Sequence, residues 1–217
     1  MEYDFNKPSN RKNTGSLKWD KYKDSDILPF WVADMDFEIA PVIQKAIAKR
    51  NEHSVYGYTI PDESVTSSVV GYLKREHGYE IDPSWIMWTP GVVPALNLFC
   101  RAFGEPGSSV MTATPVYPPF LTAPANSNRK LIAVDLKWDG IRWTFDFEKM
   151  EANVRPDTRS FILCNPHNPV GRVFDKKELE QLSEFCVKHD LVLCTDEIHS
   201  DLILEPGIKH TPTNLIS

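Results

Sequence analysis

The sequence predicts an α/β fold, in which a mostly parallel β-sheet carries helices on both of its faces. Five short apolar runs each have the length of a buried strand, and stretches with helical spacing separate several of them. Strands that alternate with helices along a chain form largely parallel sheets. With 217 residues, of which 41% are hydrophobic, the chain can bury a sizeable core. The expected strands are residues 85–89, 109–113, 130–136, 160–164 and 191–195.

The first part of the chain predicts an arm followed by two helices. Residues 1–38 are polar and irregular up to the stretch ILPFWVADMDF, so we expect an N-terminal arm over 1–38 and a large domain over 39–217. Pro41 stands at a first-turn position of a short helix that ends in basic residues. Asp62 can cap the next helix and Gly78 can end it, because apolar residues recur between them at helical spacing.

The remaining elements alternate between strands and helices. We expect helices over 92–103, 115–123 and 175–189, of which the last has an apolar face. A hairpin turn is expected within 136–143, around an Asp-Gly pair. The final residues, TPTNLIS, contain no closing helix, so we expect the fold to be incomplete at its C-terminus.

Charge and cysteine content narrow the class of protein. A net charge of −6 disfavours nucleic acid as a partner, because binding it normally requires a basic surface. The four cysteines have no CxxC spacing, which suits a reducing compartment. The N-terminus lacks the apolar core of a signal peptide, and no apolar run approaches the roughly 18 to 20 residues that span a bilayer. We therefore expect a cytoplasmic protein without a membrane partner.

Residues that follow the expected strands are the candidates for a site, because ligands bind outside the carboxyl ends of parallel strands. Gly91 precedes a helix whose free N–H groups could hold a phosphate, although an ordinary strand-to-helix turn is the favoured explanation when Gly91 is taken alone. Tyr117, in TPVYPPF, could cover a planar ligand or fill a turn. Asp196 follows an apolar run, where a carboxylate needs a cationic or N–H partner, but aspartate is also a common loop cap.

Histidines at the same strand ends could act on a ligand or bind a metal ion. His199 could donate to a ligand oxygen or act as a base, but a lone histidine is more often structural. A metal site is a weaker alternative, because the spacing of its candidate ligands matches no established pattern; these are His167, Asp196, Glu197, His199 and Asp201.

No GxGxxG or P-loop motif occurs, so a dinucleotide or P-loop site is not supported. A helix start, an aromatic ring, an asparagine and a carboxylate together fit pyridoxal 5'-phosphate.

Several motifs carry a resemblance to a known family. NPHNPVGR, at 165–172, is followed by a helix, a strand and then TDEIHSDL, at 195–202. With PFWVADMDF, YGYT and TPVYPPF, they make the chain resemble a fold-type-I pyridoxal-phosphate enzyme of the class I/II aminotransferase superfamily. It is most similar to the MalY/PatB branch of cystathionine β-lyase-like carbon–sulfur lyases. The resemblance implies the large domain of the pyridoxal-phosphate transferase fold.

This resemblance assigns roles to residues at the cofactor. It implies that Asn168 bonds the phenolic oxygen, that Asp196 pairs with the protonated ring nitrogen, and that Tyr117 stacks on the ring. His199 stands where many aminotransferases have a tyrosine, so its role is less well defined. The phosphate-binding turn consists of Gly91, Val92 and Val93; many relatives have a hydroxyl or small residue where this chain has valines.

The resemblance also implies contacts outside the large domain. Tyr58 is similar to a tyrosine that reaches the neighbouring subunit's cofactor, which implies a homodimer with shared active sites. An arm bordering the substrate pocket would contain Trp31, Ala33 and Asp34. The C-terminal small domain of the family is absent from the 217 residues.

The family's Schiff-base lysine stands in an S-x-x-K motif after the carboxylate motif, and no such motif follows Asp196. We therefore expect the N-terminal portion of a β-lyase, without turnover as it stands. The full enzyme would release pyruvate, ammonia and a thiol from a small amino acid with a β carbon–sulfur bond. An aminotransferase of the same fold remains an alternative, and so does a catalytically inactive binding or dimerisation module.

Overall fold

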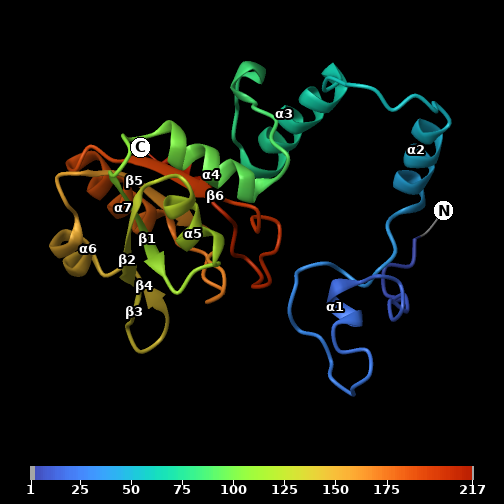
Figure 1. The fold of residues 1–217 in the computed structure, drawn as a ribbon, viewed down its shortest axis with the longest axis horizontal. Helices are drawn as coiled ribbons and strands as arrows, with labels where there is room; N and C mark the ends of the chain where they lie inside the picture. Colours follow the sequence, from blue (N-terminus) through green and yellow to red (C-terminus); the bar gives the residue numbers. More distant parts are fainter. Residues whose placement is uncertain (1–2, 217) are drawn as a thin grey trace. The chain divides into compact units, whose positions relative to one another are not determined.

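The computed structural model describes residues 3–216, and the chain divides into two compact units. The first unit ends at Ile60 and the second begins at Pro61. Each unit is described by itself below, and Figure 1 gives the labels of the elements. The boundary expected after residue 38 stays a prediction.

The first unit contains two helices, α1 (Leu17–Asp20) and α2 (Pro41–Asn51). Helix α2 begins at the predicted proline, whose missing N–H costs nothing in the first turn. The arm is more ordered than its polar sequence suggests, because the carboxylate of Asp36 accepts three hydrogen bonds at 2.7 to 3.1 Å. Their donors are Arg11, Lys18 and the indole of Trp19.

The second unit is built on a four-stranded parallel sheet with the strand order β2-β1-β5-β6. These strands are β1 (Ser109–Thr114), β2 (Lys130–Asp135), β5 (Thr158–Cys164) and β6 (Val192–Asp196). All four were predicted, because each is a short apolar run between helical segments. Strand β5 is buried at every position but one, as expected for a strand with neighbours on both sides.

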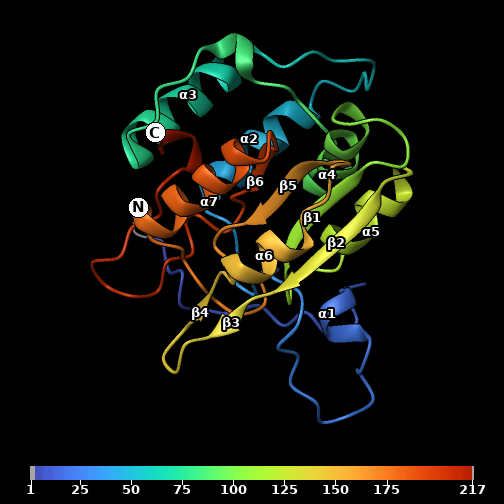
Figure 2. The same ribbon diagram turned by 90° about the vertical axis from the view of Figure 1, so that its left-hand side faces the viewer.

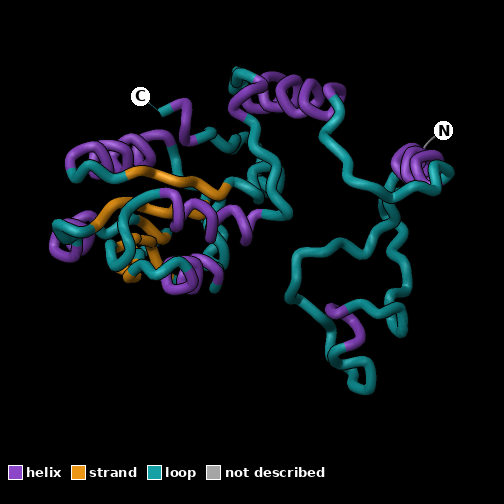
Figure 3. The backbone as a smooth tube through the Cα atoms, turned by 45° about the horizontal axis from the view of Figure 1, so that its top comes forward, coloured by secondary structure: helices purple, strands orange, loops and turns teal. Residues whose placement is uncertain are grey.

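Helices cover both faces of this sheet, as predicted (Figure 2). On one face, α4 (Val92–Ala102) and α5 (Pro119–Asn126) pack through Leu96, Cys100 and Phe120. On the other face lie α6 (Phe147–Asn153) and α7 (Lys176–Lys188). Alternate residues of the strands therefore point into two separate cores, and Figure 3 shows the strands between the helical layers.

The largest core lies between the sheet and α7, and it contains most of the buried hydrophobic side chains of the second unit. Leu179, Leu182 and Phe185 recur at helical spacing along α7 and are at most 4% exposed. A capping box formed by Asp175 and Glu178 opens this helix. The apolar face predicted for residues 175–189 is confirmed.

Other elements connect to this sheet. Helix α3 (Glu63–His77) begins after the predicted cap Asp62, and it ends at Gly78, whose φ of 64° is readily adopted only by glycine. The predicted hairpin is formed by β3 (Lys137–Trp138) and β4 (Trp143–Thr144). A short 3₁₀ turn, η2 (Thr213–Leu215), lies near the end of the chain.

The strand predicted over residues 85–89 is wrong. A 3₁₀ turn, η1 (Pro83–Trp85), opens this segment, and the residues after it have no strand partner among residues 3–216. Asp82 accepts a hydrogen bond from Ser84 N and so favours a turn at this point. Met87 is 84% exposed, because an apolar run becomes a strand only where another strand pairs with it.

Candidate functional site

The carboxyl ends of β1, β5 and β6 bring three predicted site residues to one edge of the sheet. Parallel strands end at the same edge, and hydrogen bonds join the loops that follow them. Tyr117 N donates to Asn168 O at 3.0 Å, and Asn165 N donates to Asp196 O at 3.0 Å. The backbones that carry Tyr117, Asn168 and Asp196 are therefore tied to one another in sequence from β1 to β6.

Asp196 ends β6 with a carboxylate that lacks a charged partner within residues 3–216. Its Oδ1 accepts one hydrogen bond, from Ile198 N at 3.1 Å. Burial raises the pKa of Asp196 above the usual range, although the backbone N–H of Ile198 and the nearby His199 oppose this shift. The side chain is half-buried, so a cationic group of a ligand would stabilise its ionised form.

The two asparagines of NPHNPVGR differ in their environment. Asn165 is fully buried, and its Oδ1 accepts a hydrogen bond from Phe174 N at 3.1 Å, so it stabilises the loop. Asn168 is half-buried, and its side-chain amide makes no hydrogen bond within the described part of the chain. The amide of Asn168 thus has both donor and acceptor capacity left for a ligand.

Tyr117 lies in the loop between β1 and α5. Its ring is 42% exposed, whereas the neighbouring Val116 is buried in the core under α5. The helix expected over 115–123 begins only at Pro119, because the residues before it form the turn that bonds to Asn168. The ring of Tyr117 is consequently free to cover a planar ligand at the sheet edge.

Gly91 caps the N-terminus of α4 with a φ of 128°, a conformation that a residue with a Cβ rarely adopts. No side chain caps this helix, so the first N–H groups, those of Val92 and Val93, remain open to an anion. A short loop leads from the end of α4 to the start of β1, and α4 packs on the sheet. The N-terminus of α4 must therefore lie toward the carboxyl edge.

The two histidines at this edge have different environments. His199, the predicted site histidine, is half-buried, and only its backbone oxygen makes a hydrogen bond within residues 3–216, to Leu202 N at 2.9 Å. His167 is buried, and both of its ring nitrogens face backbone carbonyl oxygens. Burial lowers the pKa of His167, and the two carbonyls oppose this shift. Among the described residues, no group of three or more His, Cys, Asp or Glu side chains could hold a metal ion, which is the arrangement that the metal alternative requires.

Glu197 and His210 form a pair that the sequence did not indicate. His210 Nε2 lies 3.0 Å from Glu197 Oε2, and the histidine side chain is 1% exposed. Glu197 also accepts from Thr213 N at 2.8 Å and from the hydroxyl of Thr195 at 3.2 Å. Burial acts to raise the pKa of Glu197, but the interactions with His210 and Thr213 lower it overall. Glu197 therefore anchors the segment after β6, and its neighbour Asp196 remains the open carboxylate.

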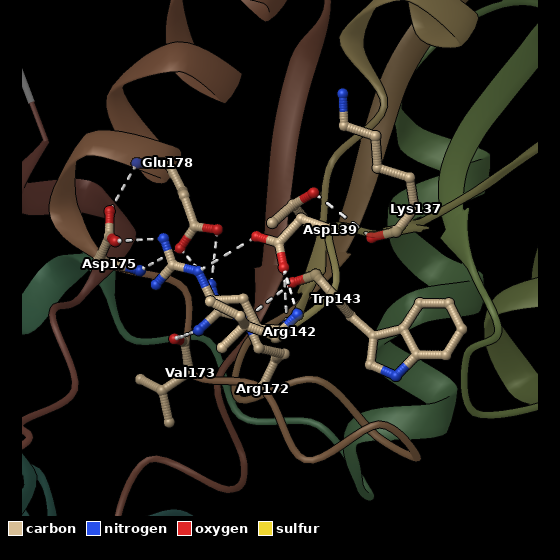
Figure 4. Close-up of polar contacts among 10 residues, drawn as sticks. Lys137, Asp139, Arg142, Trp143, Arg172, Val173, Asp175 and Glu178 are labelled. Carbon is tan, nitrogen blue, oxygen red and sulfur yellow. Dashed lines mark hydrogen bonds and ion pairs between the residues drawn. The ribbon is translucent and has the colours of Figure 1, made fainter.

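Arg172 holds the other end of the NPHNPVGR loop (Figure 4). Its guanidinium donates to the backbone oxygens of Trp143 and Val173, each at 2.8 Å, and to both carboxylate oxygens of Glu178. The side chains of Arg172 and Glu178 are 14% and 11% exposed. Backbone bonds close the loop, since His167 N donates to Arg172 O at 2.6 Å. Asn168 thus projects from a loop fixed to α7 and to the hairpin.

The remaining predicted residues belong to the first unit. Tyr58 is fully exposed in the loop after α2. The ring of Trp31 lies 4.5 Å from the ammonium of Lys21, and Asp34 forms an ion pair with Arg11. Ala33 is exposed. Their predicted contacts with substrate or with a second subunit stay predictions.

A comparison with protein families matches residues 25–215 to the model described as aminotransferase class I and II. This chain belongs to that family. Among curated proteins, it is 41% identical over 213 residues to the cystathionine β-lyase PatB of Bacillus subtilis (strain 168), covering 96% of this chain and 55% of PatB. It is 31% identical over 207 residues to the protein MalY of Escherichia coli (strain K12), covering 93% of this chain and 53% of MalY. The family and branch expected from the motifs are confirmed.

A solved structure gives the same result for the fold. Cystalysin from Treponema denticola, whose crystal structure contains pyridoxal 5'-phosphate, superposes with a TM-score of 0.91 at 38% identity. The superposition covers 100% of this chain and 57% of cystalysin. The predicted α/β fold is therefore confirmed, and the chain spans about half the length of the relatives it matches.

No helix within residues 3–216 has the length and apolar character needed to cross a membrane.

Proposed function

We propose that the chain is the N-terminal portion of a pyridoxal-phosphate-dependent carbon–sulfur β-lyase. The observation that carries the proposal is the carboxylate of Asp196, which is half-buried at the end of β6 and has one backbone N–H as its partner. The relatives named cystathionine β-lyase and the cofactor of cystalysin support the proposal. The pyridinium nitrogen of the cofactor would supply the cation that this carboxylate lacks.

Each group of the cofactor has a fitting residue in the second unit. The N–H groups of Val92 and Val93, after Gly91, would hold the phosphate at the start of α4. The unbonded amide of Asn168 would bond the phenolic oxygen, and the ring of Tyr117 would cover the ring face. His199 would be a further residue near the ring, and it lies close enough to Asp196 to act on the pKa of that carboxylate.

These residues would set the protonation and the orientation of the cofactor ring. When bound, pyridoxal phosphate supplies an electron-accepting ring that stabilises the charge left as a bond to the substrate's α carbon breaks. Asp196 keeps the ring nitrogen protonated, and Asn168 and Tyr117 keep the ring in one orientation. We propose a small amino acid with a β carbon–sulfur bond as the substrate, which yields pyruvate, ammonia and a thiol.

The proposal extends to assembly and location. We expect a homodimer with shared active sites, in which the exposed Tyr58 reaches the partner's cofactor and the arm with Trp31, Ala33 and Asp34 borders the substrate. All four cysteines are free in the structure, which is consistent with a cytoplasmic protein. Analytical ultracentrifugation of the protein that carries this chain tests the assembly; a monomer at micromolar concentration would contradict the shared site.

The cofactor part can be tested on the chain itself. Titration with pyridoxal 5'-phosphate, followed by absorbance and tryptophan fluorescence, should show saturable binding at one site. Asp196→Asn should weaken this binding at least tenfold, because the amide cannot pair with a cationic nitrogen. Asp135→Asn, at the exposed carboxyl end of β2 on the other side of the sheet, is the matched control and should leave the affinity unchanged. Absence of saturable binding by the parent chain would refute the proposed cofactor.

An aminotransferase is a second candidate, because the family model that matches residues 25–215 is that of class I and II aminotransferases. Products distinguish the two in the protein that carries this chain. A lyase releases pyruvate and a thiol from cystathionine in equal amounts. An aminotransferase transfers the amino group to a 2-oxo acid and leaves the carbon–sulfur bond intact, so a thiol-free amino transfer would replace the lyase proposal.

A further inference from the structure

His167 belongs to the loop that carries Asn168, and its imidazole faces the loop that carries Tyr117. Its side chain is 2% exposed, and Phe174 packs against the ring edge-on at 5.7 Å between centroids. The two ring nitrogens face different strand ends. Nδ1 is 3.0 Å from Cys164 O, at the end of β5, and Nε2 is 2.9 Å from Pro115 O, in the loop after β1.

Both carbonyl oxygens lack another obvious donor. Thr112 of β1 pairs with Ile162 of β5, so the same parallel register places Thr114 beside Cys164. In a parallel ladder the backbone N–H of the next residue, number 115, would then donate to Cys164 O. Residue 115 is a proline and has no N–H, so the ladder cannot supply that hydrogen bond. No other donor to Pro115 O is present among residues 3–216. A buried carbonyl without a donor is costly, and His167 is the residue that can supply one.

A second link lies beside the histidine. Tyr117 N donates to Asn168 O at 3.0 Å, so this backbone bond joins the two loops at a second point, two residues after the Pro115 contact. The imidazole contact differs from this backbone bond because it can be changed by mutation. Its loss would leave one hinge-like bond between the loops and would let the spacing of Tyr117 and Asn168 vary.

The structure assigns His167 a positioning role. Its Nε2–H joins the loop of Tyr117 to the loop of Asn168, and it thereby sets the spacing between the ring-covering side chain and the amide of the cofactor site. The functional half of this assignment rests on the proposed binding of pyridoxal phosphate. The link itself does not, because it is a property of the cofactor-free chain.

The link can be tested without the cofactor. Both partners are carbonyl oxygens, which only accept, so the assignment requires a proton on Nε2. Long-range ¹H–¹⁵N spectra of the histidine-labelled chain, assigned with a His167→Gln variant, report which ring nitrogens carry protons. We expect a protonated Nε2 at pH 7.5, either alone or together with a protonated Nδ1. An Nε2 without a proton would leave Pro115 O unbonded and would overturn the assignment.

Two substitutions separate positioning from general stability. The amide nitrogen of glutamine reaches about as far as Nε2 and keeps the contact with Pro115 O, whereas that of asparagine reaches only the Nδ1 position. Each variant of His167 thus keeps an N–H donor toward one of the two carbonyl oxygens, and the two variants should have similar stability in urea denaturation. His167→Gln should bind pyridoxal 5'-phosphate within about twofold of the parent, and His167→Asn should bind roughly tenfold more weakly.

The controls distinguish failure of the inference from failure of the proposed function. His189→Asn, at the end of α7, removes a surface contact with Glu151 and should leave the affinity unchanged. Equal losses of affinity in the Asn and Gln variants of His167 would show a merely structural role and would overturn the inference. If the parent chain fails to bind the cofactor while Nε2 is protonated, the proposed function fails and the link between the loops stands.

Discussion

Asp196→Asn is expected to stabilise the cofactor-free chain while weakening its binding of pyridoxal 5'-phosphate. The amide has the same shape as the carboxylate, and it keeps an oxygen for Ile198 N, which lies 3.1 Å from Oδ1. The substitution removes a negative charge that burial disfavours and that lies next to the like charge of Glu197. We expect the free energy of unfolding at pH 7 to rise by roughly 1 kcal/mol, as for other optimised charges.

The dependence on pH follows from the direction of the shift. Burial raises the pKa of Asp196 in the folded chain, so ionisation favours the unfolded chain as the pH rises above about 4. Below that pH the aspartate is neutral in both states, and the parent and the variant should have similar stability. The difference should therefore appear between acidic and neutral pH and then remain constant.

Urea denaturation followed by tryptophan fluorescence measures this effect. With a slope of about 2 kcal/mol/M, a gain of 1 kcal/mol moves the midpoint by about 0.5 M. Asp135→Asn is the matched control, because that aspartate is exposed at the carboxyl end of β2, at the other side of the sheet, and should give no gain. A less stable Asn variant at pH 7, or a gain of equal size at pH 3, would refute the reasoning.

Three further outcomes are expected. Arg172→Ala should lower the free energy of unfolding by about 3 kcal/mol in urea denaturation, because it leaves Glu178 buried without its partner. The control is Lys176→Met, which breaks an exposed ion pair on α7 and should change the free energy of unfolding by less than about 0.5 kcal/mol. A loss below about 1 kcal/mol for Arg172→Ala would be inconsistent with a buried ion pair. Burial raises the pKa of Cys186 to about 12, so the unfolded chain loses this proton first and stability should fall as the pH rises above about 9. Cys186→Ala should reduce that slope, and equal slopes would contradict the assignment. Lys209 is exposed in a loop, so borohydride treatment with pyridoxal phosphate should not label it stoichiometrically; peptide mass mapping checks this, and full labelling would show a lysine adduct that we do not expect.

The sheet and its helices could be predicted from local patterns. Strand β5 and its neighbours are short apolar runs, and α7 repeats apolar residues at helical spacing, so burial on one or both faces is visible in the sequence. The strand prediction for residues 85–89 failed because a strand needs a neighbouring strand to pair with, and an apolar pattern does not show whether one is present. Helix α6 was missed because its polar sequence shows little periodicity beyond Met150.

The site could be predicted in part for a similar reason. Asp196 ends β6 and Asn168 follows β5, and strand ends are where ligands bind, so both candidates could be chosen from their positions. The contribution of His167 depends on a carbonyl oxygen from a loop 52 residues earlier in the chain, which no local pattern contains. The pairing of Glu197 with His210 is a contact of the same kind.

The two consecutive acidic residues at the end of β6 have different roles: Asp196 carries the open carboxylate, and Glu197 anchors the segment that follows. Cys194 packs toward α4 and α5, while Leu193 packs toward α7, so the alternation of the strand turns Asp196 and Glu197 to different faces. A shift of β6 by one residue against β5 would exchange the open carboxylate for the one that anchors the C-terminal segment. The connection between α7 and β6 should accordingly not tolerate the insertion or deletion of a single residue, even though it lies at the opposite edge of the sheet from the site.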